Sequence, residues 1–126
     1  MSVCFCPYGK QVASGSSDNS IKIWDTNTGD CVSTLNVDSG FMGVQSISYS
    51  AAGDMIAVGC SNGKIFLVDA VTVQVKRSLN VDSFVLSISY APAGDTLAVG
   101  CANGNVLLVD AATVVVKRSL SGHSDW

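Results

Sequence analysis

Charged side chains are scarce in this chain, since Asp, Glu, Lys and Arg make up only 13% of its 126 residues and the net charge is −3. A protein that binds nucleic acid through the phosphates needs clustered Lys and Arg. No run of five like charges occurs, so we expect no nucleic-acid partner. Histidine is nearly absent as well, because His123 is the only one. With no nucleophile motif and no phosphate-binding glycine loop, we expect no catalytic residues and no enzyme.

Long apolar runs are also missing, and none approaches the ~20 residues of a membrane-spanning helix. The opening residues, MSVCFCPYGK, show no basic leader followed by an apolar segment. The five cysteines are odd in number and lie within candidate strands, which favours a reducing compartment, the cytoplasm or the nucleus. Cys4 and Cys6 share a strand face, but no second pair or histidine stands at zinc-ligand spacing. We therefore expect no membrane association, no metal and no cofactor.

Internal similarity is what the chain has in abundance. A shift of 41 residues aligns residues 46–79 with 87–120, and most positions are identical. A shift of 44 residues aligns 2–39 with 46–83 more loosely. Repeats of this length are typical of the four-stranded blades of a β-propeller. The difference between the two periods indicates a loop insertion at residues 40–43.

Each period predicts strands and turns and no helix. The expected strands are 2–6, 11–16, 20–25 and 31–35, then 44–49, 55–60, 64–69 and 73–79, then 85–90, 96–101, 105–110 and 114–120. Asn62-Gly63 and Asn103-Gly104 are typical of two-residue hairpins. We predict an all-β propeller of four-stranded antiparallel blades, with blades at 1–36, 43–80 and 84–120. Residues 121–126 would begin a further repeat.

The first period, SVCFCPYGKQVASGSSDNSIKIWDTNTGDCVSTL, resembles a WD40 repeat along its whole length, including the Trp24-Asp25 pair. The second and third periods resemble the same family more weakly, and SGHSDW resembles the Gly-His loop that opens a WD40 repeat. Three blades do not readily close a ring. The resemblance therefore implies that the other blades come from the same longer chain or from identical copies joined head to tail.

The resemblance also implies a structural hydrogen-bond network. In WD40 repeats a histidine, a serine or threonine, an aspartate and a buried tryptophan are linked, and the matching residues are Ser14, Asp18 and Trp24, with His123 in the histidine position of a further repeat. The second and third periods have apolar or amide residues at these positions, namely Val58, Asn62, Val68, Val99, Asn103 and Val109. Replacing the polar chain as a unit leaves no single buried group unpaired. We expect these two blades to be held by valine packing.

Function is expected to lie in the loops. The resemblance implies a non-catalytic scaffold that binds other proteins or peptides in a multiprotein complex. The candidate contact residues precede the first strands of two blades and are Asp38, Phe41, Met42, Asp82 and Phe84. Asp25, Asp69 and Asp110 end successive third strands, where we expect turn caps and not a cation site.

Two basic pairs, Lys76-Arg77 and Lys117-Arg118, lie on the predicted outermost strands. Charges there protect a sheet edge from pairing, or they bind an acidic partner. Two alternatives to the scaffold therefore stay open. One is a cytoskeletal, microtubule-associated protein of the atypical-propeller type, and the other is a structural module that assembles head to tail into a closed ring.

Overall fold

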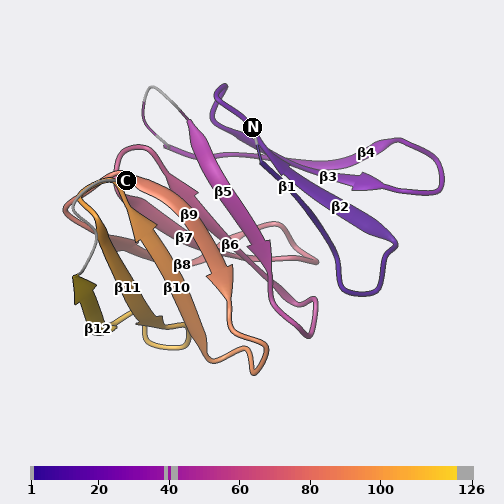
Figure 1. Ribbon diagram of the computed structural model, residues 1–126. Helices are drawn as coiled ribbons and strands as arrows, with labels where there is room; N and C mark the ends of the chain where they lie inside the picture. Colours follow the sequence, from indigo (N-terminus) through magenta and orange to yellow (C-terminus); the bar gives the residue numbers. More distant parts are fainter. Residues whose placement is uncertain (1, 39, 41–42, 122–126) are drawn as a thin grey trace.

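The computed structural model describes residues 2–38, 40 and 43–121, and their regular elements are all β-strands. The strands are β1 Ser2–Phe5, β2 Gln11–Gly15, β3 Ser20–Asp25, β4 Cys31–Asn36, β5 Val44–Tyr49, β6 Met55–Cys60, β7 Lys64–Asp69, β8 Val75–Asn80, β9 Val85–Tyr90, β10 Thr96–Cys101, β11 Asn105–Asp110 and β12 Val116–Ser121. They form three antiparallel sheets of four consecutive strands each (Figure 1). The all-β architecture predicted from the sequence is confirmed.

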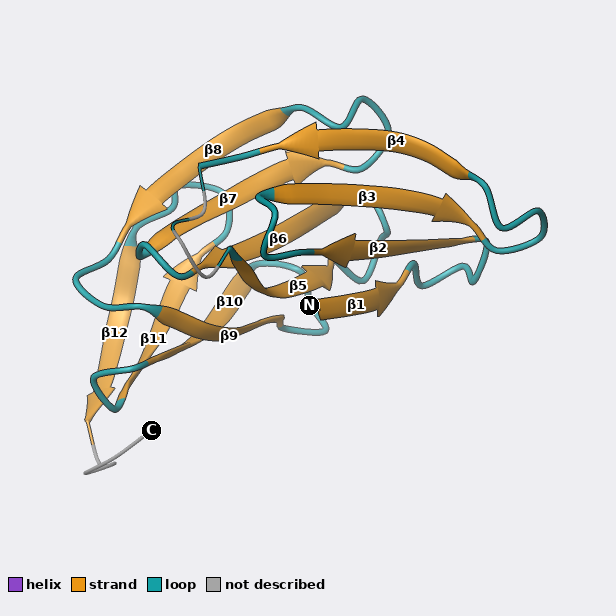
Figure 2. Cartoon of the chain, turned by 90° about the horizontal axis from the view of Figure 1, so that it is seen from above, coloured by secondary structure: helices purple, strands orange, loops and turns teal. Residues whose placement is uncertain are grey.

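The three sheets follow one another along an arc when seen from above (Figure 2). The first strand of each sheet (β1, β5, β9) lies on the inner side of the arc, and the last strand (β4, β8, β12) lies on its outer side. Neighbouring inner strands are joined by serine hydroxyls. Ser2 Oγ accepts a hydrogen bond from the Ile47 N–H at 3.2 Å, and Ser46 Oγ accepts one from the Ile88 N–H at 3.1 Å. The same contact thus recurs at both junctions between sheets.

Two apolar interfaces hold the arc together. The first interface, between β1–β4 and β5–β8, contains the fully buried Ile56 and Val68. The second interface, between β5–β8 and β9–β12, contains the equally buried Leu67 and Val85. Because side chains alternate along a strand, β7 supplies Val68 to one interface and Leu67 to the other. This explains why the third strand of the middle sheet is apolar almost throughout.

A glycine in each interface lets a valine approach the backbone of the preceding sheet. A Cβ atom added to Gly15 would lie 2.3 Å from Val44 Cγ1, and one added to Gly59 would lie 2.5 Å from Val85 Cγ1. The equivalent glycine of the third sheet is Gly100. An added Cβ there would have Ser87 Cβ as its nearest neighbour among the described residues, at 3.8 Å. Among the described residues, no side chain therefore fills the space beside Gly100 as Val44 and Val85 fill the spaces beside Gly15 and Gly59.

The fourth strands of the second and third sheets begin later than the sequence predicts. Apolar residues led us to expect strands from 73 and 114, but β8 begins at Val75 and β12 at Val116. Val73 and Val114 adopt left-handed φ values of 55° and 54°, at positions where the first sheet has Gly29 with φ 77°. This region is unfavourable for β-branched residues. Both valines are partly buried against the interfaces, so their side chains pack although the backbone of the turn is strained. An apolar sequence pattern cannot distinguish such a turn from a strand.

Candidate functional site

The polar network expected around Trp24 is assembled only in part. Trp24 Nε1 donates a hydrogen bond to Ser14 Oγ at 2.9 Å, across neighbouring strands. Asp18 has other partners, because its carboxylate accepts hydrogen bonds from the backbone N–H of Ser20, at 3.0 Å, and from the Ser20 hydroxyl. These bonds hold the pKa of Asp18 below its usual range. His123 lies outside the described residues.

Trp24 is half-buried and not enclosed as the sequence suggested. It lies on the face of the first sheet that is turned away from the second sheet. No other described sheet packs against this face. Val3 and Phe5 of the inner strand are 65% and 68% exposed. The equivalent residues of the second sheet, Ile47 and Tyr49, are only 5% and 6% exposed because the first sheet covers them. The face that carries Trp24 therefore has apolar residues at the positions that are buried between sheets elsewhere in the arc.

We expect Trp24→Phe to lower the free energy of unfolding by about 1 kcal/mol, because an aromatic ring stays while the indole N–H that bonds Ser14 is lost. Trp24→Ala should cost about 2 kcal/mol, less than the roughly 3–5 kcal/mol of an enclosed aromatic side chain. Guanidinium titrations of both variants measure these losses. In a Ser14→Ala background the cost of Trp24→Phe should be smaller by the contribution of the hydrogen bond, and an undiminished cost there would contradict a role for this bond.

The three aspartates that end the third strands cap turns. Asp25 Oδ1 accepts backbone hydrogen bonds at 2.8 and 3.1 Å. Asp69 Oδ1 accepts two at 2.9 Å, from Thr72 and Val71, and these bonds lower the pKa of that carboxyl. Asp110 Oδ1 likewise accepts two at 2.9 Å, and its pKa is lowered in the same way. The Oδ1 atom of each carboxylate thus caps its own turn.

The described residues contain no cluster of three His, Cys, Asp or Glu side chains that could hold a metal ion. Cys60 and Cys101 are buried, and burial raises the pKa of the Cys60 thiol to about 12 and also that of Cys101. A protonated, buried thiol is a poor nucleophile. Across residues 2–38, 40 and 43–121 there is no helix long and apolar enough to cross a membrane.

The loops that lead into β5 and β9 carry the predicted contact residues. Asp38 and Asp82 are exposed, and Phe84 is 45% exposed. Phe41 and Met42 lie outside the described residues. The two aspartates occur in the same tetrapeptide, Asn-Val-Asp-Ser, at 36–39 and 80–83, but their surroundings differ.

Asp38 is held by the hairpin between β6 and β7. Lys64 Nζ lies 2.8 Å from Asp38 Oδ2, and Asn62 Nδ2 donates to the Asp38 carbonyl oxygen at 2.9 Å. The contact with Lys64 is the main reason that the pKa of Asp38 is lowered. Sequence analysis missed Lys64. Its signal was that Lys64 and Asn105 differ between two repeats, 46–79 and 87–120, that share most of their residues.

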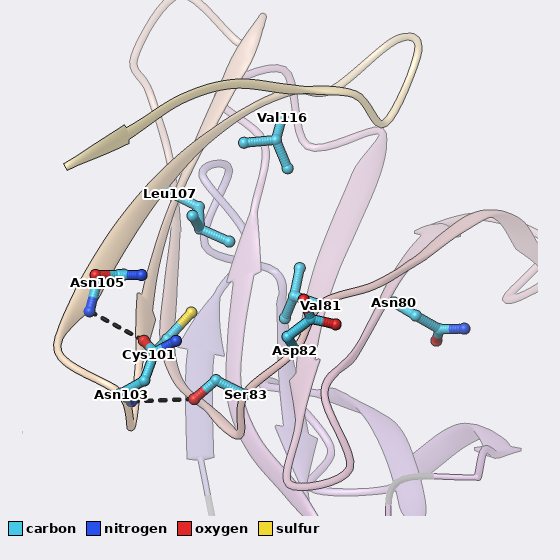
Figure 3. Close-up of a pocket in the computed structure, with 9 residues that line it drawn as sticks. All are labelled: Asn80, Val81, Asp82, Ser83, Cys101, Asn103, Asn105, Leu107 and Val116. Atoms are coloured by element: carbon cyan, nitrogen blue, oxygen red, sulfur yellow. Dashed lines mark hydrogen bonds between the residues drawn. The ribbon is translucent and has the colours of Figure 1, made fainter. Parts of the chain in front are cut away.

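Asp82 borders a pocket of about 270 Å³ between the loop at 80–83 and the hairpin that joins β10 to β11 (Figure 3). The hairpin is fastened to the loop, because the Asn103 N–H donates a hydrogen bond to Ser83 Oγ at 3.0 Å. Polar and apolar groups both line the pocket, and they are Asn80, Asp82, Ser83, Asn103 and Asn105, with Val81, Cys101, Leu107 and Val116. A concave site with a few polar groups is the usual form of a binding site.

The predicted basic pairs are exposed on the last strands of the second and third sheets, where they comprise Lys76 and Arg77 of β8 and Lys117 and Arg118 of β12. The pairing of each strand with its neighbour is irregular at this point, as in a β-bulge. Bulges and charges are both devices that block pairing at a sheet edge. Lys117 also has partners in its own sheet, since its Nζ donates to Thr96 Oγ1 at 2.8 Å and lies 3.8 Å from Asp110 Oδ2.

Three successive four-stranded sheets, each with its first strand on the inner side of an arc, define a segment of a β-propeller. The family model described as "WD domain, G-beta repeat" matches residues 1–25, 29–69 and 74–110. The chain therefore belongs to the WD40 family, as its sequence resemblance indicated.

Solved WD40 propellers have the same fold over nearly the whole chain. The crystal structure of Sqt1 from Saccharomyces cerevisiae matches with a TM-score of 0.87 and 23% identity, over 99% of this chain and 36% of that protein. The structure of U3-55K and the crystal structure of the RRP9 WD40 repeats match with TM-scores of 0.91 and 0.92, both at 18% identity, over 98% of this chain and 39% of theirs. At such identities the likeness concerns the fold alone. The chain spans between 36% and 39% of the length of these proteins.

Proposed function

We propose that the chain is a non-catalytic scaffold segment that binds other proteins or peptides in a multiprotein complex. The binding surface would be the loop face, defined here by Asp38, Asp82 and Phe84. The observation that carries the proposal is the pocket beside Asp82, formed by loops that rigid sheets hold in place. Loops on a rigid scaffold are where binding residues concentrate, and an exposed aromatic side chain such as Phe84 is a frequent anchor. All five cysteines are unpaired, which fits a location in the cytoplasm or nucleus.

A peptide-display selection tests this proposal. A library of random twelve-residue peptides is selected against the immobilised chain, and each enriched peptide is measured against two variants. Asp82→Asn/Phe84→Ser alters the loop face, whereas Lys76→Ser/Arg77→Ser alters the exposed edge of β8. Enriched peptides should lose binding to the first variant and keep it with the second. Loss confined to the edge variant, with a preference for acidic peptides, would instead support the cytoskeletal alternative. A selection without enrichment would contradict both.

A second proposal concerns the two open sheet faces, which we infer are covered by further WD40 blades. On the first sheet this face carries Val3, Phe5 and Trp24, and on the third it carries Val106 and Leu108. Support comes from equivalence, because each of these faces corresponds position by position to a face of the middle sheet that is buried in an interface. The covering blades would come from the same longer chain or from identical copies. Light scattering tests the second source, since head-to-tail assembly requires a discrete multiple of 13.0 kDa.

A further inference from the structure

The pocket beside Asp82 has a filled counterpart in the same chain. At the first interface the aspartate of the Asn-Val-Asp-Ser tetrapeptide, Asp38, receives the ammonium group of Lys64 at 2.8 Å. The residue equivalent to Lys64 in the third sheet is Asn105, and the residue equivalent to Phe66 is Leu107. Both replacements are smaller, and the pocket lies where they occur. The chain itself thus contains an occupied and a vacant form of one site.

The vacant form leaves Asp82 without a partner among the described residues. Asp82 makes no hydrogen bond or ion pair with any residue that the structure describes, whereas Asp38 has both. Asn105 Oδ1 accepts a hydrogen bond from Ser121 Oγ at 3.0 Å, and a carbonyl oxygen has a second lone pair. In Figure 3 the Asp82 side chain and the hairpin residues Asn103 and Asn105 stand on opposite sides of the pocket, with Leu107 between the two groups. The Asp82 carboxylate thus borders a space that also has apolar walls.

We propose that this pocket binds a lysine side chain of a protein partner, in the manner in which Lys64 occupies the first interface. The ammonium group would pair with the Asp82 carboxylate. The four-carbon stem would lie along Leu107 and Val116, as lysine stems do on apolar surfaces. A volume of about 270 Å³ is ample for such a side chain. The inference rests on the proposed protein-binding function, for which it names the chemistry of the partner.

The minimal probe is n-butylammonium chloride, which has the stem and the head group of lysine, and n-butanol is its uncharged control. We expect the ammonium probe to shift the side-chain amide signals of Asn103 and Asn105 saturably in the ¹⁵N-labelled chain, and n-butanol to leave them unchanged. Asp82→Asn should weaken this binding by about tenfold, because the carboxylate charge that pairs with the ammonium group is removed. The dispersion of the backbone spectrum verifies that the variant is folded.

Two further variants exchange the vacant and the filled site. Asn105→Lys should abolish binding of the probe, since the new side chain reaches Asp82 as Lys64 reaches Asp38. Lys64→Asn should create a second binding site, detected at the Asn62 side-chain amide. Absence of saturable shifts, equal shifts with n-butanol, or unchanged binding in Asp82→Asn would each overturn the inference. If the probe fails while enriched peptides still require the loop face, only this inference falls. If the probe binds but no peptide is enriched, the pocket binds an ammonium group, but the scaffold proposal falls and with it the protein partner that would supply the lysine.

Discussion

Gly59→Ala is expected to lower the free energy of unfolding by about 2–3 kcal/mol, the upper range for overpacking a close-packed site. The cause is the 2.5 Å that would separate the new Cβ from Val85 Cγ1, a distance at which the two sheets must move apart. The displacement would spread along the second interface, because Val85 is fully buried among its neighbours. Guanidinium titration followed by circular dichroism measures the effect.

Gly100→Ala is the matched control. It adds the same methyl group at the equivalent position of the third sheet, where the nearest described atom, Ser87 Cβ, lies at an ordinary 3.8 Å. We expect a change within about 0.5 kcal/mol, as for other unconstrained surface sites. If a further blade covers this face, Gly100→Ala should weaken that association and leave the fold of the chain intact. Equal destabilisation by both substitutions would contradict the packing of Val85 against Gly59.

Leu67→Ala is expected to cost about 3–4 kcal/mol, because it leaves a cavity in the fully buried part of the second interface. The equivalent residue of the third sheet, Leu108, is only half-buried, and Leu108→Ala should cost about 1 kcal/mol since solvent fills the vacated space. Both leucines lie at the same position of a third strand, so local strand propensity cancels in the comparison. Comparable losses in thermal or denaturant unfolding would show that the face of the third sheet turned away from the second sheet is covered in solution.

The architecture could be predicted because the strand pattern is a local property of the sequence and the repeat period follows from aligning the sequence with itself. Turn glycines and asparagines marked hairpins between apolar segments, and these signals need no knowledge of tertiary contacts. The environment of Trp24 could not be derived in this way. The burial of Trp24 depends on whether another sheet covers the first one. Asp18 bonds the nearby Ser20 and not the Ser14–Trp24 pair. The turns at Val73 and Val114 could not be predicted either. Their strained φ values occur within segments whose apolar residues predict a strand.

Only part of the candidate site could be predicted from the sequence, namely the two aspartates. Asp38 and Asp82 lie in identical tetrapeptides, so any local analysis assigns them the same role. Their difference arises from Lys64, which is distant from Asp38 in the sequence and reaches it only because two sheets pack together. The substitution of Asn105 at the equivalent position became informative once that contact was known. Comparison of repeats within one chain is thus more sensitive to such a site than composition or motif searches.

The serine bridges between inner strands recur in the same form, from Ser2 to Ile47 and from Ser46 to Ile88, and they introduce an ambiguity during folding. The second and third blades share most of their residues, so either one offers the first blade nearly the same docking surface. We therefore expect that a refolding chain can join its first blade to the third and leave the second looped out, as in the misassembly known for repeat proteins. Synthesis on the ribosome favours the correct junction, because the second blade emerges and docks before the third exists.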